Sequence, residues 1–287
     1  MSLLLALALA SGTIPAPASG APDEIIVEGN RSSKSVANKY LDGVLPSSFD
    51  FQPGRFEDRL CLGVVGLPDK LKSEVEARVQ RVAVATKVAL AAPGCRPNFL
   101  IIVVDDKKAM IEGMWRQKQS YLYGVGEAAE RRLASEPGPV AAWQVSEVIC
   151  ADGIPLQVDR DGIKRMFSLT QPSRVTTTTR TRLLGSVVVI EQKALVDVTT
   201  TQLADFALVR GLTPIEPQEN VAPGSSVLSL FSGTLGPEDA PQSLTWWDLA
   251  FLKALADTNS DRVASVQRHE IRDKMLKEMA KIPAAER

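Results

Sequence analysis

The sequence predicts an α+β fold in which helices pack against a mixed β-sheet. The clearest elements are an apolar strand at Leu183–Glu191, reading LLGSVVVIE, and two helices that follow it at Thr200–Arg210 and Trp246–Ala256. Both helices are apolar around nearly their whole circumference, which is typical of helices buried in a core. Strands and helices also succeed one another along the first half of the chain, and this order favours a mixed sheet covered by helices.

Each of the two apolar helices carries a start signal. Thr199 followed by Gln202 matches a capping box, and Thr245 followed by Asp248 repeats the pattern. Gly211 follows the first helix, and we expect it to take the left-handed conformation of a C-terminal cap. We expect the helices to place three large apolar side chains in the core, namely Leu203, Phe206 and Phe251.

The remaining elements are predicted from apolar runs, caps and helix breakers. Strands are expected at Arg59–Gly66, Asn98–Val104 and Val140–Cys150, and helices after Pro68, at Lys107–Gln119, at Glu127–Ser135 and at Asp261–Lys281. Met166–Leu169 is a further candidate strand, and the threonine run Val175–Thr181 favours either an edge strand or an extended loop.

The domain organisation is predicted from composition. The opening MSLLLALALA is too short to cross a bilayer and is followed by small residues, so residues 1–18 are expected to be a signal peptide. Residues 19–50, rich in Pro, Ala, Gly and Ser, are expected to form a disordered, flexible linker. A single α+β domain over 51–258 and a C-terminal helix within 259–287 complete the chain. We therefore expect a periplasmic or secreted protein without a transmembrane segment.

A short apolar patch, Ile25, Ile26 and Val27, lies within the expected linker in the stretch DEIIVEGNR. This stretch resembles the strand-forming segment near the mature N-terminus of TonB-dependent outer-membrane receptors. Two interpretations stay open. The patch is either an exposed β-prone tail or a strand that docks onto a partner in the cell envelope.

The three cysteines agree with export. Cys61 and Cys95 flank the helix expected after Pro68, and a disulfide between them would stabilise the fold by about 3–4 kcal/mol. Cys150 would then remain as a buried thiol. The alternative is a cytosolic protein. Its three cysteines would then be reduced, because disulfides are rare in that compartment.

Composition and motifs exclude several chemistries. With 33 basic and 34 acidic residues, the chain has a net charge of −1, which argues against a nucleic-acid partner. A zinc site with two histidines on one helix is impossible, because His269 is the only histidine. Gly124–Ala129 matches G-x-G-x-x-A, but the preceding QKQSYLY makes a poor buried strand, so we expect no dinucleotide site. We expect no cofactor and no metal.

The stretch Leu183–Ala256 resembles a family. A strand, a helix ending in R-G-L, the segment SVLSLF and then LTWWDLAFLKAL are similar to a secreted bacterial family of unknown function. Some of its members resemble zincin metallopeptidases, with a helix of the type H-E-L-x-H-x-L-G-L. The resemblance implies a zincin-like fold. Ala204 and Leu208 stand where that motif has its metal-binding histidines, and Asp205 stands where it has its glutamate base.

The resemblance thus implies a zincin-like scaffold without its zinc ligands. Our first hypothesis is an exported, non-catalytic protein of this kind that binds a protein or peptide partner in the cell envelope. The alternative is a metal-independent hydrolase that uses a buried carboxylate near Asp205. An enzyme would need Asp205 to face an open cleft with converging polar groups, whereas Asp205 that only compensates the positive end of its helix would not.

Overall fold

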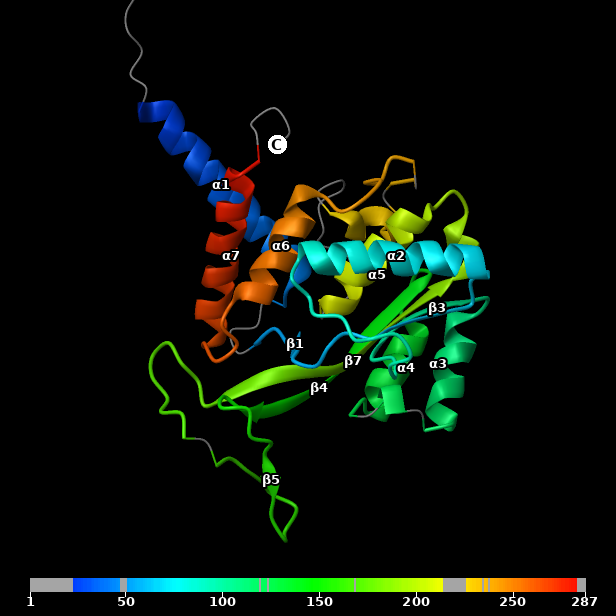
Figure 1. Ribbon diagram of the computed structural model, residues 1–287, viewed down its shortest axis with the longest axis horizontal. Helices are drawn as coiled ribbons and strands as arrows, with labels where there is room; N and C mark the ends of the chain where they lie inside the picture. Colours follow the sequence, from blue (N-terminus) through cyan, green and yellow to red (C-terminus); the bar gives the residue numbers. More distant parts are fainter. Residues whose placement is uncertain are drawn as a thin grey trace, which may run out of the picture.

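The computed structural model describes residues 23–46, 51–118, 120–122, 124–167, 169–213, 226–233, 235–236 and 238–282. The expected signal peptide lies outside these residues. The described chain combines helices with a mostly parallel mixed sheet, which confirms the α+β class (Figure 1). None of the helices in the described ranges combines the length and hydrophobicity needed to span a bilayer.

The bounds of the elements are as follows. The α-helices are α1 (Asp23–Val44), α2 (Asp69–Ala85), α3 (Lys107–Arg116), α4 (Glu127–Ser135), α5 (Thr200–Leu212), α6 (Trp246–Asp257) and α7 (Ala264–Ala280). The strands are β1 (Arg55–Phe56), β2 (Leu62–Val65), β3 (Phe99–Val104), β4 (Val140–Cys150), β5 (Gln157–Val158), β6 (Lys164–Arg165) and β7 (Thr179–Glu191). Short 3₁₀ helices are η1 (Ser120–Leu122), η2 (Gln192–Leu195) and η3 (Val227–Phe231).

The central sheet is organised around β7. Strand β4 pairs antiparallel with β7 along nearly its whole length, from Val140 opposite Ile190 to Cys150 opposite Thr179. Strands β3 and β1 therefore share the other side of β7, where both run parallel to it, and β2 lies beyond β3. This arrangement makes β4 an edge strand of the sheet.

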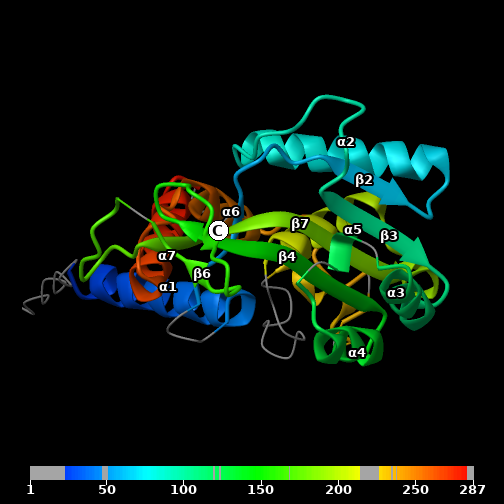
Figure 2. The ribbon, with the colours of Figure 1, turned by 90° about the horizontal axis from the view of Figure 1, so that it is seen from below.

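Helices cover both faces of the sheet. Helices α2 and α5 lie on one face, and α3 and α4 lie on the other (Figures 1 and 2). Successive residues of β7 divide between these layers, because side chains alternate along a strand. Val188 and Ile190 join the larger apolar cluster under α2 and α5, whereas Val187 and Val189 join the cluster under α3 and α4.

Helices α5 and α6 form the centre of the larger cluster. Both begin with the expected capping boxes, at Thr199 and Thr245, in which each threonine hydroxyl accepts from a backbone N–H three residues on. Leu203 is 4% exposed, and Phe206 and Phe251 are fully buried. The core predicted from the apolar helices therefore lies where α5 and α6 meet the rest of the fold.

The expected linker is helical over most of its length. Asp23–Val44 form α1, so the prediction of a flexible segment is wrong for these residues. The reason is an apolar stripe at helical spacing, Ala37, Tyr40, Leu41 and Val44, which is buried against the rest of the fold. Figure 1 shows α1 lying beside α7. Ile25, Ile26 and Val27 belong to this helix, so the interpretation as a β-prone tail or docking strand is also wrong.

The disulfide prediction is confirmed. Cys61 and Cys95 are bonded with their Cα atoms 6.1 Å apart, and Cys150 is a buried free thiol. The bridge joins the chain just before β2 to the turn that precedes β3. Asn98 strengthens the same junction, since its Oδ1 accepts from the backbone N–H of Cys61 at 2.7 Å.

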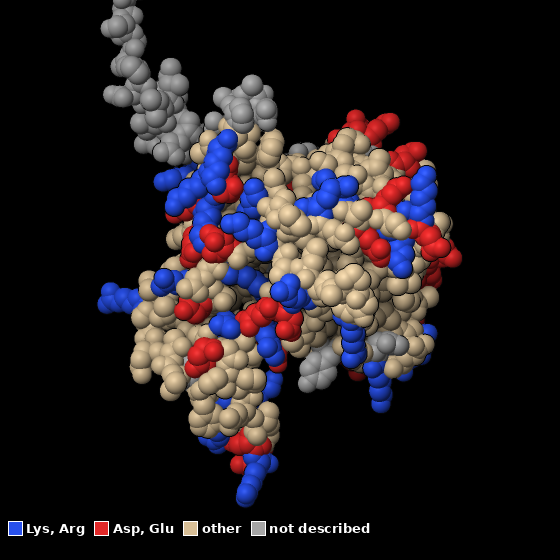
Figure 3. Space-filling model, viewed as in Figure 1, with Lys and Arg blue, Asp and Glu red and all other residues tan. Residues whose placement is uncertain are grey.

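Residues 151–178 form an arm that projects from the β4–β7 pair and contains the small β5–β6 hairpin (Figures 1 and 3). Met166, Phe167 and Leu169 do not form the expected strand, because pairing ends at Lys164–Arg165. Several large apolar side chains of the arm are exposed, notably Phe167 and Leu169. At its base the threonine run is extended, and Thr179–Thr181 opens β7.

Candidate functional site

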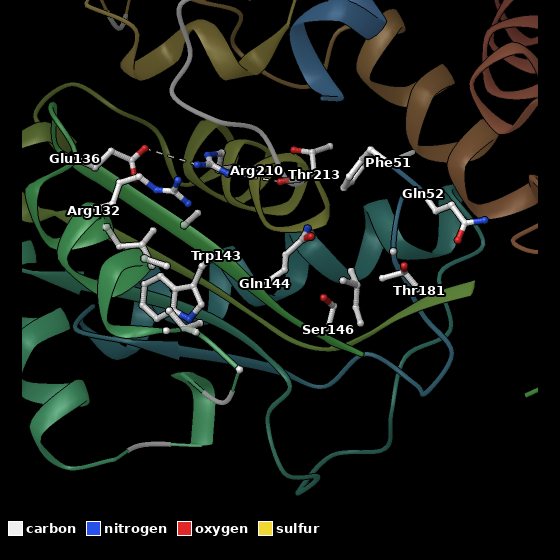
Figure 4. Close-up of a pocket in the computed structure, with 18 of the residues that line it drawn as sticks. Phe51, Gln52, Arg132, Glu136, Trp143, Gln144, Ser146, Thr181, Arg210 and Thr213 are labelled. Atoms are coloured by element: carbon white, nitrogen blue, oxygen red, sulfur yellow. Dashed lines mark hydrogen bonds and ion pairs between the residues drawn. The ribbon is translucent and has the colours of Figure 1, made fainter. Parts of the chain in front are cut away.

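A cavity of about 500 Å³ opens along the free edge of β4 (Figure 4). Its floor is the edge strand itself. One wall comes from the C-terminal end of α5 and from the segment before β1, and the other comes from α4 and the loop that leads into it. The lining residues that carry polar or aromatic groups are Phe51, Gln52, Arg132, Ser135, Glu136, Trp143, Gln144, Ser146, Thr181, Arg210 and Thr213.

Packing between α5 and the sheet fixes one wall. The backbone oxygen of Gly211 accepts from the Gln144 side-chain amide at 2.8 Å and from the Ser186 hydroxyl at 2.8 Å. Gly211 lies inside α5 and not beyond its end, so the expectation of a left-handed C-cap is wrong. A glycine is needed for a different reason: a Cβ there would lie 2.4 Å from the Phe99 ring.

Trp143 and two glycines shape the opposite wall. The indole N–H of Trp143 donates to the backbone oxygen of Tyr121 at 2.7 Å, which holds the ring against the loop before α4. Gly124 and Gly126 line the cavity, and Gly126 is the N-cap residue of α4. Their G-x-G-x-x-A motif follows the 3₁₀ helix η1 and not a strand, so it lacks the strand–turn–helix context of a dinucleotide site.

Arg210 and Glu136 place a buried charge pair at one end of the cavity. Arg210 comes from the last turn of α5 and is 4% exposed, and its Nη2 lies 3.8 Å from Oε1 of Glu136. Its Nη1 reaches the backbone oxygen of Thr213 at 3.5 Å. Burial lowers the pKa of Arg210 and raises the pKa of Glu136, and the attraction between the two charges opposes both shifts. Figure 4 shows Arg132 beside the same pair.

Lys107 stands behind this charged end. Its ammonium donates to the backbone oxygens of Glu136 (2.5 Å), Gly138 (2.8 Å) and Val140 (3.4 Å). Desolvation lowers the pKa of Lys107. The side chain thereby fixes the turn between α4 and β4 and occupies the outward carbonyl of Val140.

The three residues that occupy the zincin-motif positions, Ala204, Asp205 and Leu208, lie away from the cavity. Ala204 and Asp205 are fully buried and Leu208 is 1% exposed, and none of the three lines the cavity. Asp205 accepts two 2.7 Å hydrogen bonds from the Arg78 guanidinium of α2 and one of 2.8 Å from the backbone N–H of Leu244. Asp205 is thus the partner in an internal ion pair. The sequence analysis considered only a charge that compensates the positive end of the helix or a base that faces an open cleft.

The only histidine and two arginines of β7 lie away from the cavity lining. His269 is exposed on α7. Arg180 pairs with Glu57, and Arg182 with Glu147, at the base of the arm. Within the described residues, no group of three His, Cys, Asp or Glu side chains is placed to hold a metal ion.

Sequence reasoning missed the residues that build the cavity. Arg210, Glu136, Trp143 and Gln144 come from α5, the end of α4 and β4, and each looked unremarkable within its own segment. One signal was present: Arg210 is the only cation in the largely apolar helix TTQLADFALVRGL. A charge in a buried helix requires a partner or a site.

Comparisons with other proteins assign no relationship. The chain matches no protein-family model, no curated protein and no solved structure.

Proposed function

We propose that this chain is an exported, non-catalytic protein that binds an extended peptide segment of a partner along the free edge of β4. The single observation that carries the proposal is that the floor of the cavity is a strand edge to which no other strand of the described residues pairs. An exposed edge presents unpaired N–H and C=O groups, and an incoming strand satisfies them by extending the sheet.

The register identifies the backbone groups that are available. The N–H of Glu191 donates to the oxygen of Pro139 at 2.9 Å, so in antiparallel alternation Ala141 and Trp143 direct their peptide groups toward β7. Ala142 and Gln144 consequently direct theirs away from β7. Both residues line the cavity.

The two ends of β4 limit the free edge. Lys107 already engages the Val140 oxygen at one end. At the other end the chain folds back, with Ile149 bridged to Pro155 and the Cys150 N–H donating to the Ile154 oxygen. Among the described residues, no strand pairs with the outer edge of β4 from Ala142 to Val148, which is a suitable length for one short added strand.

The surroundings of Asp205 favour binding over hydrolysis. A general base must reach its substrate, whereas Asp205 is fully buried and holds three hydrogen bonds from within the fold. The Cys61–Cys95 disulfide supports export to an oxidising compartment such as the periplasm.

Binding is tested with a library of fluorescein-labelled random hexapeptides and measured by fluorescence anisotropy. Selected peptides should lose binding when alternate backbone nitrogens are methylated and should tolerate methylation at the positions between, because only every second N–H of an added strand faces β4. Failure to select any peptide, or a uniform response to methylation, would contradict the proposal.

A matched pair of glycine variants locates the site. A Cβ at Gly126 or at Gly113 meets no atom within 4 Å, and neither glycine has a positive φ, so both accept a larger residue. Gly126 lines the cavity and Gly113 does not. Gly126→Phe should weaken peptide binding at least tenfold, whereas Gly113→Phe should leave it unchanged.

A further inference from the structure

We infer that the charged end of the cavity, Arg210, Arg132 and Glu136, is a receptor for a carboxylate of the bound peptide, and that the peptide therefore runs antiparallel to β4. This inference rests on the proposed function. The carboxylate belongs either to the C-terminus of the peptide or to an Asp or Glu side chain near it.

Two arginine–carboxylate pairs, Arg78–Asp205 and Arg210–Glu136, differ in the distances between their charged groups. Arg78 and Asp205 form a bidentate pair with both contacts at 2.7 Å. Arg210 lies 3.8 Å from Glu136 and 3.5 Å from the Thr213 oxygen, which is longer than the roughly 2.7–2.9 Å of a charge-assisted hydrogen bond. Arg210 thus retains donor capacity, and it does so in a side chain that is 4% exposed and lines the cavity.

Two guanidinium groups and one carboxylate line this end of the cavity. Arg210 and Arg132 both line the cavity, and Glu136 is the carboxylate between them (Figure 4). Lys107 lies behind the turn, where backbone carbonyls hold its ammonium and the carboxylates of Glu136 and Glu191 balance its charge. A carboxylate can accept two hydrogen bonds from the planar guanidinium of an arginine, so an anionic group of the peptide is attracted to this end of the cavity, whereas an ammonium group is repelled.

The position of the cluster along β4 sets the direction of the peptide. Glu136 lies just before Val140, so the cluster stands at the N-terminal end of β4, and Ser146 and Thr181 lie toward the other end (Figure 4). A strand added antiparallel brings its C-terminus to the N-terminal end of β4. A parallel strand would instead bring its α-ammonium to two arginines.

The inference is tested with two matched hexapeptide libraries that differ only in a free or an amidated C-terminus. Peptides selected from the free-carboxylate library should weaken at least tenfold on amidation. If amidation has no effect but replacing one Asp or Glu by its amide weakens binding tenfold, the side chain is the source. If neither change matters while the N-methyl pattern persists, the carboxylate receptor is wrong and edge binding stands. If no peptide binds at all, the proposed function fails.

Protein variants locate the receptor. Arg132→Gln, at an exposed position on α4, should reduce the preference for carboxylate over amide, whereas Arg131→Gln, one residue away and outside the cavity, should not. Arg210→Gln should abolish the preference. Since that change leaves Glu136 without its partner, the double variant Arg210→Gln, Glu136→Gln is measured beside it. A folded double variant that still prefers the carboxylate tenfold would overturn the assignment.

Discussion

At the scale of single residues, Asp248 shows how much one buried carboxylate organises. It accepts hydrogen bonds from the Tyr40 hydroxyl (2.7 Å), the Ser226 hydroxyl (2.5 Å) and the Val227 N–H (2.9 Å). It also accepts from the N–H and hydroxyl of its own capping residue, Thr245, at 2.9 Å each. One carboxylate thereby connects α1, the turn before η3 and the start of α6, and burial raises its pKa despite these donors.

Replacing Asp248 should therefore have an effect that depends on the replacement. Asp248→Ala leaves several buried donors without an acceptor, and we expect a loss of about 3–5 kcal/mol in the free energy of unfolding. Asp248→Asn should cost only about 1–2 kcal/mol, because the Tyr40 and Ser226 hydroxyls can rotate to accept from the amide. Urea denaturation of both variants, with the exposed Asp58→Asn as control, measures the difference.

Wild type and Asp248→Asn together test the pKa of Asp248. Because the folded pKa lies above the unfolded value of about 3.9, the extra stability is present below that value and is lost as the pH rises through the folded pKa. The amide introduced by Asp248→Asn does not titrate, so the difference in stability should shift in favour of the variant between pH 4 and pH 7. Glu136, whose pKa is also raised, is present in both proteins and cancels. A constant difference over this range would contradict the raised pKa.

At the scale of elements, Asp205 is the point where α5 is tied to its neighbours. Its carboxylate pairs with Arg78 of α2 and accepts from the N–H of Leu244, just before α6. In the sequence, Asp205 stands where the resembled zincin motif has its glutamate base, and only our alternative hypothesis gave a carboxylate near it a catalytic role. In the structure, Asp205 instead connects α5 to α2 and to the start of α6.

We therefore expect Asp205→Asn to destabilise the protein by about 2–4 kcal/mol. Breaking a buried ion pair costs roughly 3–5 kcal/mol, and Arg78, which is 23% exposed, recovers part of its hydration. Unfolding of Asp205→Asn, Arg78→Met and the double variant forms a cycle, and the double variant should lose less than the sum of the two single changes. An additive cycle would mean that the pair contributes no coupling.

At the scale of the whole molecule, the Cys61–Cys95 disulfide joins the segments that precede β2 and β3, on the side of the sheet opposite the cavity. It closes a loop over 34 positions of sequence that contains all of α2. Because β3 pairs directly with β7, this constraint acts on the sheet that carries β4 without touching the cavity.

Removing the bridge should thus lower stability and leave binding unchanged. For Cys61→Ser, Cys95→Ser we expect a loss of about 3–4 kcal/mol, since the unfolded chain regains the entropy of an open loop. Wild type unfolded in urea with and without dithiothreitol should show the same difference, and Cys150 remains unaltered in every sample. Equal midpoints with and without reductant would show that the bridge does not stabilise the fold.

Local elements were predictable because their signals lie within a few residues. The bounds of α4 and β4 follow from a proline-glycine stop and a regular apolar pattern, and the capping box at Thr199 involves only residues up to Gln202. Helix α1 was missed although its apolar stripe is equally local, because the proline-, glycine- and serine-rich composition around it favoured a linker.

The sequence alone determined the α+β class, the buried character of α5 and α6, and the pairing of the only two cysteines that flank a helix. Only the tertiary structure decided where the cavity and the proposed binding edge lie. The cavity is lined by Phe51, Arg132, Trp143 and Arg210, which come from segments that no local sequence pattern connects. Asp205 likewise pairs with Arg78, which lies 127 positions away in the sequence. Helical periodicity and capping depend on residues a few positions apart in the sequence. An accessible strand edge and a buried ion pair depend instead on how segments far apart in the sequence pack together.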